Sequence, residues 1–277
     1  MHAGCLCHLG DSNIWGDHTV HLEEGTDRSR FLGGRERMCA AFFHGRWCAE
    51  IGVTKLCVLD DDKRCPKNVC VGVVRLVAAD GTEKAVARYS NCFRGSTHTN
   101  VHAEAFATKD RKLADLMCPG DTLILYLSYQ PCHRNGGGRW VRDHATSCSS
   151  MLCEWARGAL SGRGVRLEVR CSDIFRAGWA DPGKFASTAD AALFHARCEA
   201  ARDGIRMLHA EPNAAISGFT PDDWAFLWTL SDPTQFSEQE RGARAAFDLK
   251  ICAFIGSLKA ESPPPPKTGP GPTLQSS

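Results

Sequence analysis

Four residues in the middle of the chain have types and a spacing that could hold a catalytic zinc ion. His102 and Glu104 stand two positions apart in the stretch His-Ala-Glu. Cys132 and Cys148 follow on either side of a polar segment that is rich in glycine and arginine. One histidine and two thiolates leave one tetrahedral position of zinc open for water, which is typical of catalytic rather than structural sites. Zinc lowers the pKa of that water to about 7 and so produces a nucleophile.

The stretch His-Ala-Glu is a weak signal by itself, because a solvated helix start has the same composition. Side chains two residues apart on a helix point about 200° apart, so His102 and Glu104 cannot both face one metal ion. Near the start of a helix, both can still border one cleft. His102 would then bind the metal, and Glu104 would remain free beside the open position as a general acid and base.

The two cysteines follow elements that would place them at one site. Pro131 and Cys132 come after an apolar run at 122–128, which we expect to be a strand buried on both faces. In α/β sheets, ligands bind outside the carboxyl ends of the strands. Cys148 starts the next expected helix, where backbone N–H groups and the helix dipole favour a thiolate. Cys153 is about 140° further round that helix and cannot face the same metal, so we assign Cys148.

The polar segment between the two cysteines is interpreted as a loop inserted between two ligands of one site. Its basic and aromatic residues give weak support to a nucleic-acid groove; they are Arg134, Arg139, Trp140 and Arg142. We interpret His133 and His144 as polar loop residues rather than ligands, because three ligands are already assigned.

Around these positions, strands and helices are expected to alternate. Asp80-Gly81 is a hairpin turn signal between strands at 69–77 and 87–93. Further strands are expected at 122–128, 166–171 and 214–219, and helices at 30–50, 101–117, 149–160, 195–209, 220–230 and 237–258. This order predicts an α/β fold in which about six helices flank a mixed five-stranded sheet, with an antiparallel hairpin followed by parallel strands.

We expect one large domain at residues 29–261, between two segments without regular structure. Residues 1–28 are rich in histidine and cysteine and are expected to be flexible, although a stray metal could bind there to Cys5, Cys7, His2 and His8. Proline and glycine at 262–277 predict a disordered tail. The formal net charge of the 277 residues is +1, so a nucleic acid would need a local basic groove.

The compartment is inferred from what the sequence lacks. The chain has no basic start followed by an apolar run, and no apolar run of about eighteen residues. We therefore expect no signal peptide in the sequence as given, no membrane partner, and an intracellular location that is cytoplasmic or nuclear. The 15 cysteines are then expected to be mostly buried free thiols. If a leader had been removed upstream, disulfides would be expected instead.

Three stretches of the sequence resemble the AID/APOBEC family of polynucleotide cytidine deaminases. They are His-Ala-Glu at 102–104, Ser-Tyr-Gln-Pro-Cys at 128–132, and the run DGIRMLHAEPNAAISGFTPDDWAFLWTL at 203–230. The likeness covers about 69–230 and is similar to divergent AID/APOBEC-like deaminases, some of which carry an insertion after the Pro-Cys pair. Two features depart from the family pattern. The second cysteine does not follow two to four residues after the first, and Tyr129 replaces the tryptophan of Ser-Trp-Ser-Pro-Cys.

The resemblance implies a cytidine-deaminase-like α-β-α sandwich with one catalytic Zn²⁺ on His102, Cys132 and Cys148. Cys148 takes the position of the family's second cysteine once the insertion is removed. Glu104 would move a proton from the zinc-bound water to the ring nitrogen and then to the departing ammonia, while hydroxide attacks C4 of cytosine. The implied activity is hydrolytic deamination of cytosine to uracil in single-stranded nucleic acid, with DNA favoured over RNA.

The resemblance also implies substrate contacts. Family members carry an asparagine near the target nucleotide, which corresponds to Asn91 or, as the alternative, Asn100. Tyr129 matches an aromatic residue that packs on the target base. The segment 171–185 corresponds to the loop that reads the base 5′ of the target, and its candidate contacts are Asp173, Phe175, Arg176 and Trp179. The structural alternatives are a turn asparagine, a core tyrosine and a solvated loop with two anchoring aromatic residues.

Two other functions stay open at the level of the sequence. One is a free cytidine or deoxycytidine deaminase, which has less need of long helices and an aromatic-basic loop. The other is a catalytically silent zinc protein that binds nucleic acid. Glu104 argues against this function, because a purely structural zinc site does not need an acid beside an open position. We expect single-stranded DNA or RNA as the partner and assume a monomer.

Overall fold

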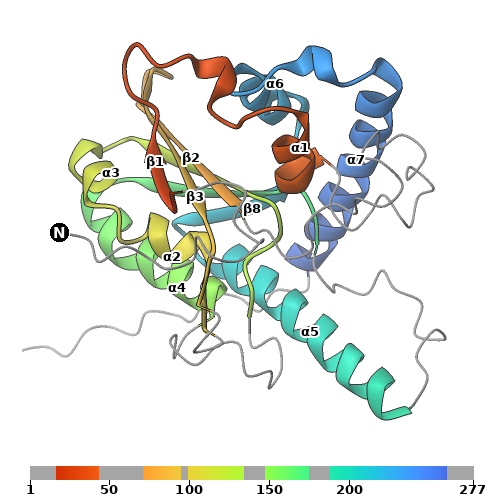
Figure 1. The fold of residues 1–277 in the computed structure, drawn as a ribbon. Helices are drawn as coiled ribbons and strands as arrows, with labels where there is room; N and C mark the ends of the chain where they lie inside the picture. Colours follow the sequence, from red (N-terminus) through yellow and green to blue (C-terminus); the bar gives the residue numbers. More distant parts are fainter. Residues whose placement is uncertain (1–16, 44–70, 95–98, 134–146, 175–187, 261–277) are drawn as a thin grey trace, which may run out of the picture.

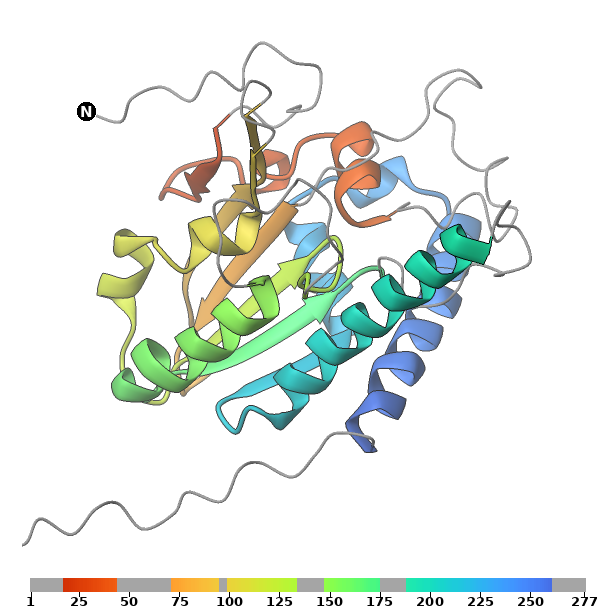
Figure 2. The same ribbon diagram turned by 90° about the horizontal axis from the view of Figure 1, so that it is seen from below.

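The computed structural model describes residues 17–43, 71–94, 99–133, 147–174 and 188–260. Within them, helices lie on both faces of one open six-stranded sheet (Figure 1 and Figure 2). The strands follow the order β1 (Thr19–His21), β3 (Glu83–Ser90), β2 (Val71–Val77), β6 (Thr122–Leu127), β7 (Arg166–Cys171) and β8 (Ala214–Gly218). A separate small sheet pairs β4 (Cys92–Arg94) with β5 (Thr99–Val101). The helices are α1 (Arg35–Met38), α2 (Ala103–Ala107), α3 (Arg111–Leu116), α4 (Cys148–Trp155), α5 (Thr188–Ala210), α6 (Pro221–Thr229) and α7 (Glu238–Ala260).

The sheet has the predicted mixture of strand directions. β2 and β3 form the expected antiparallel hairpin, and Gly81 in its turn has a φ of 87°, a conformation that favours glycine. β2 is antiparallel to β6, whereas β6, β7 and β8 are parallel, which confirms the expected crossovers. The carboxyl ends of these three strands therefore meet at one edge of the sheet.

The prediction of five strands is wrong, because the sheet has a sixth. β1 pairs antiparallel with β3 and places Thr19 opposite Tyr89. It lies within the segment 1–28, which we expected to be flexible because its sequence has no sustained period. A strand of three residues is too short to show an alternating pattern, so only the pairing with β3 reveals it.

The single helix expected at 101–117 is also wrong, because the chain forms two short helices there. Val101 belongs to β5, and α2 ends before Asp110, which caps the N-terminus of α3 by accepting a hydrogen bond from Leu113 N at 3.1 Å. Residues of two strands contact the carboxylate of Asp110. Tyr89 Oη of β3 donates to Asp110 Oδ2 at 2.6 Å, and His21 Nε2 of β1 lies 2.8 Å from the same oxygen. These tertiary contacts override the helical pattern of the sequence.

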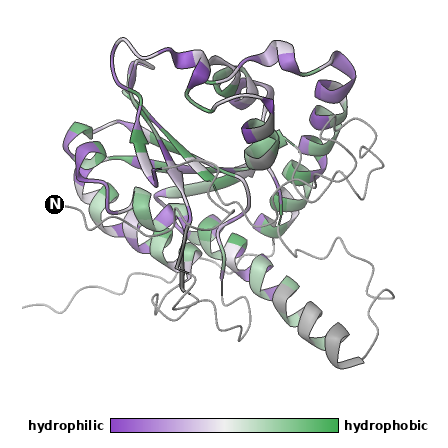
Figure 3. Cartoon of the chain, viewed as in Figure 1, coloured by the Kyte–Doolittle hydropathy of each residue, from purple (hydrophilic) through white to green (hydrophobic). Residues whose placement is uncertain are grey.

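Buried side chains form two clusters, one on each face of the sheet. α2, α3, α4 and α5 lie on one face, α1 and α6 lie on the other, and α7 packs against the edge strand β8 (Figure 1). Hydrophobic residues concentrate on the strands and on the helix sides that face them (Figure 3). The helix expected from residue 30 begins at Arg35 instead, but its predicted apolar residues Met38, Phe42 and Phe43 are all buried.

Several expectations concern residues beyond this description. The second half of the helix expected at 30–50 and the tail at 262–277 lie outside the described residues. Of the eight cysteines described as free thiols, five are buried, as predicted for small hydrophobic side chains. Every helix in the described part of the chain is too short or too polar to span a membrane.

Candidate metal centre

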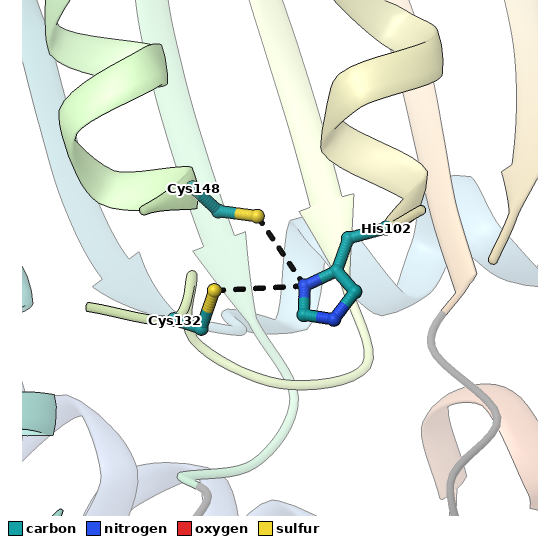
Figure 4. Close-up of side chains that lie close together, drawn as sticks. All are labelled: His102, Cys132 and Cys148. Atoms are coloured by element: carbon teal, nitrogen blue, oxygen red, sulfur yellow. Dashed lines mark hydrogen bonds between the residues drawn. The ribbon is translucent and has the colours of Figure 1, made fainter. Parts of the chain in front are cut away.

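Three candidate ligands come from three elements at the carboxyl edge of the parallel strands (Figure 4). His102 is the N-cap residue of α2, Cys132 follows β6, and Cys148 is the first residue of α4. Cys132 Sγ lies 3.6 Å from His102 Nδ1, and Cys148 Sγ lies 3.3 Å from the same nitrogen. All three ligand atoms lie within 4.8 Å of one another, so the structure brings together the three residues that the sequence predicted as ligands.

The spacing of these atoms suits a tetrahedral zinc ion. Zinc binds imidazole nitrogen at about 2.1 Å and thiolate sulfur at about 2.3 Å, so a tetrahedral angle separates the two ligand atoms by about 3.6 Å. The two N–S distances of 3.6 and 3.3 Å agree with this value. Among the described residues, the group holds three side chains and no fourth. The donor set is therefore compatible with a zinc ion that keeps one open position.

The sequence before α4 explains why Cys148 stands where it does. Ser147 caps the helix, and its Oγ accepts a hydrogen bond from Ser150 N at 3.2 Å. Cys148 is thereby fixed at the first helical position, as the sequence predicted. Its thiol lies near the positive end of the helix dipole, where a thiolate is stabilised.

The charges of the three groups favour thiolate formation. A hydrogen bond from Cys148 lowers the pKa of the Cys132 thiol to about 4, with burial opposing and His102 assisting the change. Burial acts to lower the pKa of His102, but the hydrogen bond to Cys132 and the charge of Glu104 together raise it to about 9. A metal cation at this place would bind the thiolate and the neutral imidazole, because metal ligands have to be deprotonated.

Glu104 lies beside this group without belonging to the ligand set. It stands in the first turn of α2, its exposed fraction is 1%, and burial raises the pKa of its carboxyl group. A hydrogen bond with Cys148 and the charge of His102 act in the opposite direction. A buried carboxyl group next to the ligands, but not among them, suits a group that exchanges protons with a water on the metal.

The structure describes only some of the residues predicted to contact substrate. Tyr129 and Asp173 follow β6 and β7 at the same edge of the sheet, where Gln130 N donates to Asp173 O at 3.1 Å. Tyr129 is partly buried, whereas Asp173 is almost fully buried. Asn91 lies between β3 and β4 and is partly buried, and the backbone of its alternative, Asn100, belongs to β5. These positions leave the proposed contacts as predictions.

Other predicted contacts fall in segments that the structure does not describe. Phe175, Arg176 and Trp179 lie outside the described residues, so their expected roles are untested. The same holds for the basic and aromatic residues of the insertion and for one histidine, namely Arg134, Arg139, Trp140, Arg142 and His144.

The contacts of one residue near the ligands were not foreseen from the sequence. His133 lies in a loop and outside the group of candidate ligands, as expected, but its exposed fraction is 7%, and its Nδ1 forms a 2.7 Å hydrogen bond with Ser147 Oγ. The pattern Ser-Cys-Ser-Ser at 147–150 marks a helix cap, which could have identified Ser147. No local pattern connects that cap with His133, because the pairing is made across the insertion.

Comparisons with known proteins leave the family open. No model of a protein family matches this chain. A comparison with curated proteins found no match either. The likeness to the AID/APOBEC family therefore rests on the motifs in the sequence and on the convergence of His102, Cys132 and Cys148, which we use below as support for a proposal.

Proposed function

We propose that this chain is a zinc-dependent cytidine deaminase of cytidine-deaminase-like fold that converts cytosine to uracil in single-stranded nucleic acid. One observation carries the proposal. His102, Cys132 and Cys148 converge with ligand spacing while Glu104 is buried beside them. A structural zinc site is closed by four protein ligands, whereas a three-ligand site next to a carboxyl group has the composition of a hydrolytic centre.

The roles of the residues follow from their positions. His102, Cys132 and Cys148 would hold the metal, which supplies a water of lowered pKa when it is bound. Glu104 accepts a proton from the attacking water and delivers it to N3 of cytosine, and a proton then leaves with the amino group as ammonia. Water and cytosine are consumed, and uracil and ammonia are formed, so Glu104 ends the cycle in its starting state.

The choice of a polymeric substrate rests on separate support. The sequence resembles polynucleotide deaminases at three stretches, and the segment between the two cysteines carries three arginines and a tryptophan, Arg134, Arg139, Arg142 and Trp140. Basic and aromatic side chains bind single strands through phosphates and stacked bases. DNA is favoured over RNA on the resemblance.

A parallel assay tests this function. The purified chain is incubated with single-stranded DNA, single-stranded RNA and free cytidine, its zinc content is measured, and uracil or uridine is scored, with Glu104→Ala as the control. We expect deamination of an oligonucleotide that falls as salt rises from about 50 to about 200 mM, because phosphate contacts release counterions.

Two other outcomes point to the other functions. Equal activity on free cytidine with no response to salt would assign the chain to the free nucleoside deaminases. Zinc in the protein without turnover of any of the three substrates would favour the catalytically silent zinc protein.

A further inference from the structure

Three hydrogen bonds join the two chain segments that carry the cysteines. His133 follows Cys132, Ser147 precedes Cys148, and His133 Nδ1 lies 2.7 Å from Ser147 Oγ. We propose that this pair is a clamp that positions the two thiolates for the metal, with His133 as a positioning residue. The inference rests on the proposed zinc site, and it concerns how this chain holds two ligands that residues 134–146 separate in the sequence.

The second and third bonds lie directly beside the first. Ser149 N donates to Cys132 O at 3.1 Å, and Ser149 Oγ donates to Pro131 O at 3.2 Å. Ser149 and His133 are both buried. Each cysteine is thus flanked by residues bonded to the opposite segment, which fixes the backbone on both sides of the ligand pair.

Ser147 links the clamp to the helix that carries Cys148. Its Oγ accepts from Ser150 N at 3.2 Å and lies 2.9 Å from Ser150 Oγ, while it also bonds His133. The same hydroxyl group therefore sets the start of α4 and joins that start to the segment after Cys132. A shift of His133 would move the first helical residue, which is Cys148.

Gly204 of α5 packs closely against His133 of the clamp and against Ser149. A Cβ atom at Gly204 would lie 2.6 Å from Ser149 Oγ and 2.7 Å from His133 Cβ, which is closer than real contacts allow. The helix backbone thus lies directly against His133 and Ser149. This contact restrains both residues, and any side chain at Gly204 would displace them.

The need for such a clamp follows from the spacing of the cysteines. In a short Cys-x-x-Cys stretch, the turn between the two residues sets the distance between their sulfur atoms. Here residues 134–146 intervene in the sequence, and the entropic cost of holding two chain ends together rises with the length of chain between them. Non-covalent bonds between the two ends offset this cost and fix their geometry. Partners that orient metal ligands from outside the ligand set typically change metal affinity by 10–100-fold when removed.

Zinc affinity and the absorption spectrum of the cobalt-substituted chain test the clamp without any use of catalysis. We compare the unchanged chain with His133→Ala, Ser147→Ala and His133→Asn, whose amide group can occupy the place of Nδ1. The alanine variants should bind zinc about 10–100-fold more weakly, with altered cobalt bands, and His133→Asn should restore most of both. The matched control is His209→Ala, because His209 is a half-buried histidine bonded to Ile255 O at 2.9 Å, outside the cluster of candidate ligands.

The outcomes separate the clamp from the proposed function. Unchanged affinity and cobalt bands in both His133→Ala and Ser147→Ala would overturn the clamp and leave the zinc site standing. The same loss in His209→Ala would also overturn it, because the effect would then be general destabilisation. Absence of metal binding by the unchanged chain would overturn the proposed function itself. If His133→Ala does not fold, Ser147→Ala and its partner Ser147→Thr, which keeps the hydroxyl group, decide the question.

Discussion

Cys148 and Cys153 lie on the same helix, yet only the thiol of Cys148 belongs to the group of candidate metal ligands. Cys148 Sγ is 3.3 Å from His102 Nδ1. Cys153 is part of the hydrophobic core, with an exposed fraction of 4%, and burial raises the pKa of its thiol to about 11. The helical rotation between the two positions thus separates a candidate thiolate ligand from a neutral core side chain.

Replacement of each cysteine by serine should therefore have opposite effects. Cys148→Ser is expected to lose zinc and activity together, because a hydroxyl group is a far poorer zinc ligand than a thiolate. Cys153→Ser should keep both and lose about 1–3 kcal/mol of stability, since it buries a hydroxyl group among apolar neighbours. Metal content and urea unfolding of the two variants measure these effects. Zinc retained in Cys148→Ser and lost in Cys153→Ser would reverse the ligand assignment.

The sequence was sufficient to predict that the three candidate ligands lie together. His102 and Cys148 stand at helix starts and Cys132 follows a buried strand, and local signals predict all three positions. β3 and β6 are both antiparallel to β2 and therefore run in the same direction, so the segments that follow them reach one edge of the sheet, where α/β folds bind ligands.

What the sequence could not predict depends on contacts between distant segments. The expected helix is interrupted at Asp110, whose carboxylate binds Tyr89 and His21 from distant parts of the sequence. β1 is a strand because it pairs with β3. His133 is buried because it meets Ser147 across the insertion. A short polar stretch carries no period that reports such partners, so local patterns predict a loop or a continuous helix there.

Glu104→Gln separates metal binding from proton transfer. The amide has the volume of the carboxyl group but cannot accept and return a proton, and Glu104 is outside the ligand group. We expect about one zinc per chain as in the unchanged protein, with turnover lower by roughly 10²–10⁴-fold or more. Metal analysis and single-turnover rates measure the two effects. Near-normal turnover in this variant would reject the role of Glu104 as the proton carrier.

Arg244 and Asp248 form a buried pair that joins α7 to the end of β7. Arg244 Nε donates to Asp248 Oδ1 at 3.1 Å, Arg244 Nη2 donates to Ser172 O, and Trp224 Nε1 donates to Asp248 Oδ2 at 2.7 Å. Both charged side chains are almost fully buried. The pair thus ties a helix to the strand end that precedes Asp173.

Removal of one partner of this pair should strongly destabilise the folded chain. Arg244→Met leaves a buried carboxylate without its cation and should lower the free energy of unfolding by about 3–5 kcal/mol. Lys112→Met is the control, because Lys112 pairs with Glu23 on the surface and its loss should cost less than about 1 kcal/mol. Urea denaturation compares the two. Equal small losses would mean that Arg244 is not needed to neutralise Asp248.

Glu240 predicts a dependence of stability on pH. Burial acts to raise the pKa of its carboxyl group, but hydrogen bonds from Arg35 and Ser237 prevail and hold it below its ordinary value. Ser237 N donates to Glu240 Oε2 at 2.8 Å, and Glu240 N donates to Ser237 Oγ at 3.2 Å, so the pair caps α7. A lowered pKa means that the ionised carboxylate stabilises the folded state.

This stabilisation is present above the ordinary pKa of a glutamate, about 4.3, and is lost as the pH falls through the lower folded value. Glu240→Gln should therefore reduce the unfolding free energy clearly at pH 7 and much less at about pH 3. Glu238→Gln, an exposed position on the same helix, is the control and should show little change at either pH. A loss for Glu240→Gln that is the same at both pH values would show that the charge of this residue does not contribute.

The clamp leads to a final prediction about the insertion itself. The segments around Cys132 and Cys148 are bonded to each other through His133, Ser147 and Ser149, and none of these contacts involves residues 134–146. A linker of about five glycine and serine residues, with a reach of roughly 3.3 Å per residue, should be able to join His133 to Ser147. Replacing residues 134–146 by this linker should therefore leave one zinc per chain and an unchanged cobalt spectrum.

The same replacement also tests what the insertion does for substrate. It removes the basic residues Arg134, Arg139 and Arg142 while the candidate ligands and Glu104 stay in place. If these arginines bind phosphates, activity on an oligonucleotide should fall and respond less steeply to salt, whereas slow turnover of free cytidine should not change. Loss of zinc in the shortened chain, when His133→Ala also loses it, would mean that the insertion and the clamp hold the thiolates jointly. Unchanged oligonucleotide activity with an unchanged salt response would exclude these arginines from the substrate groove.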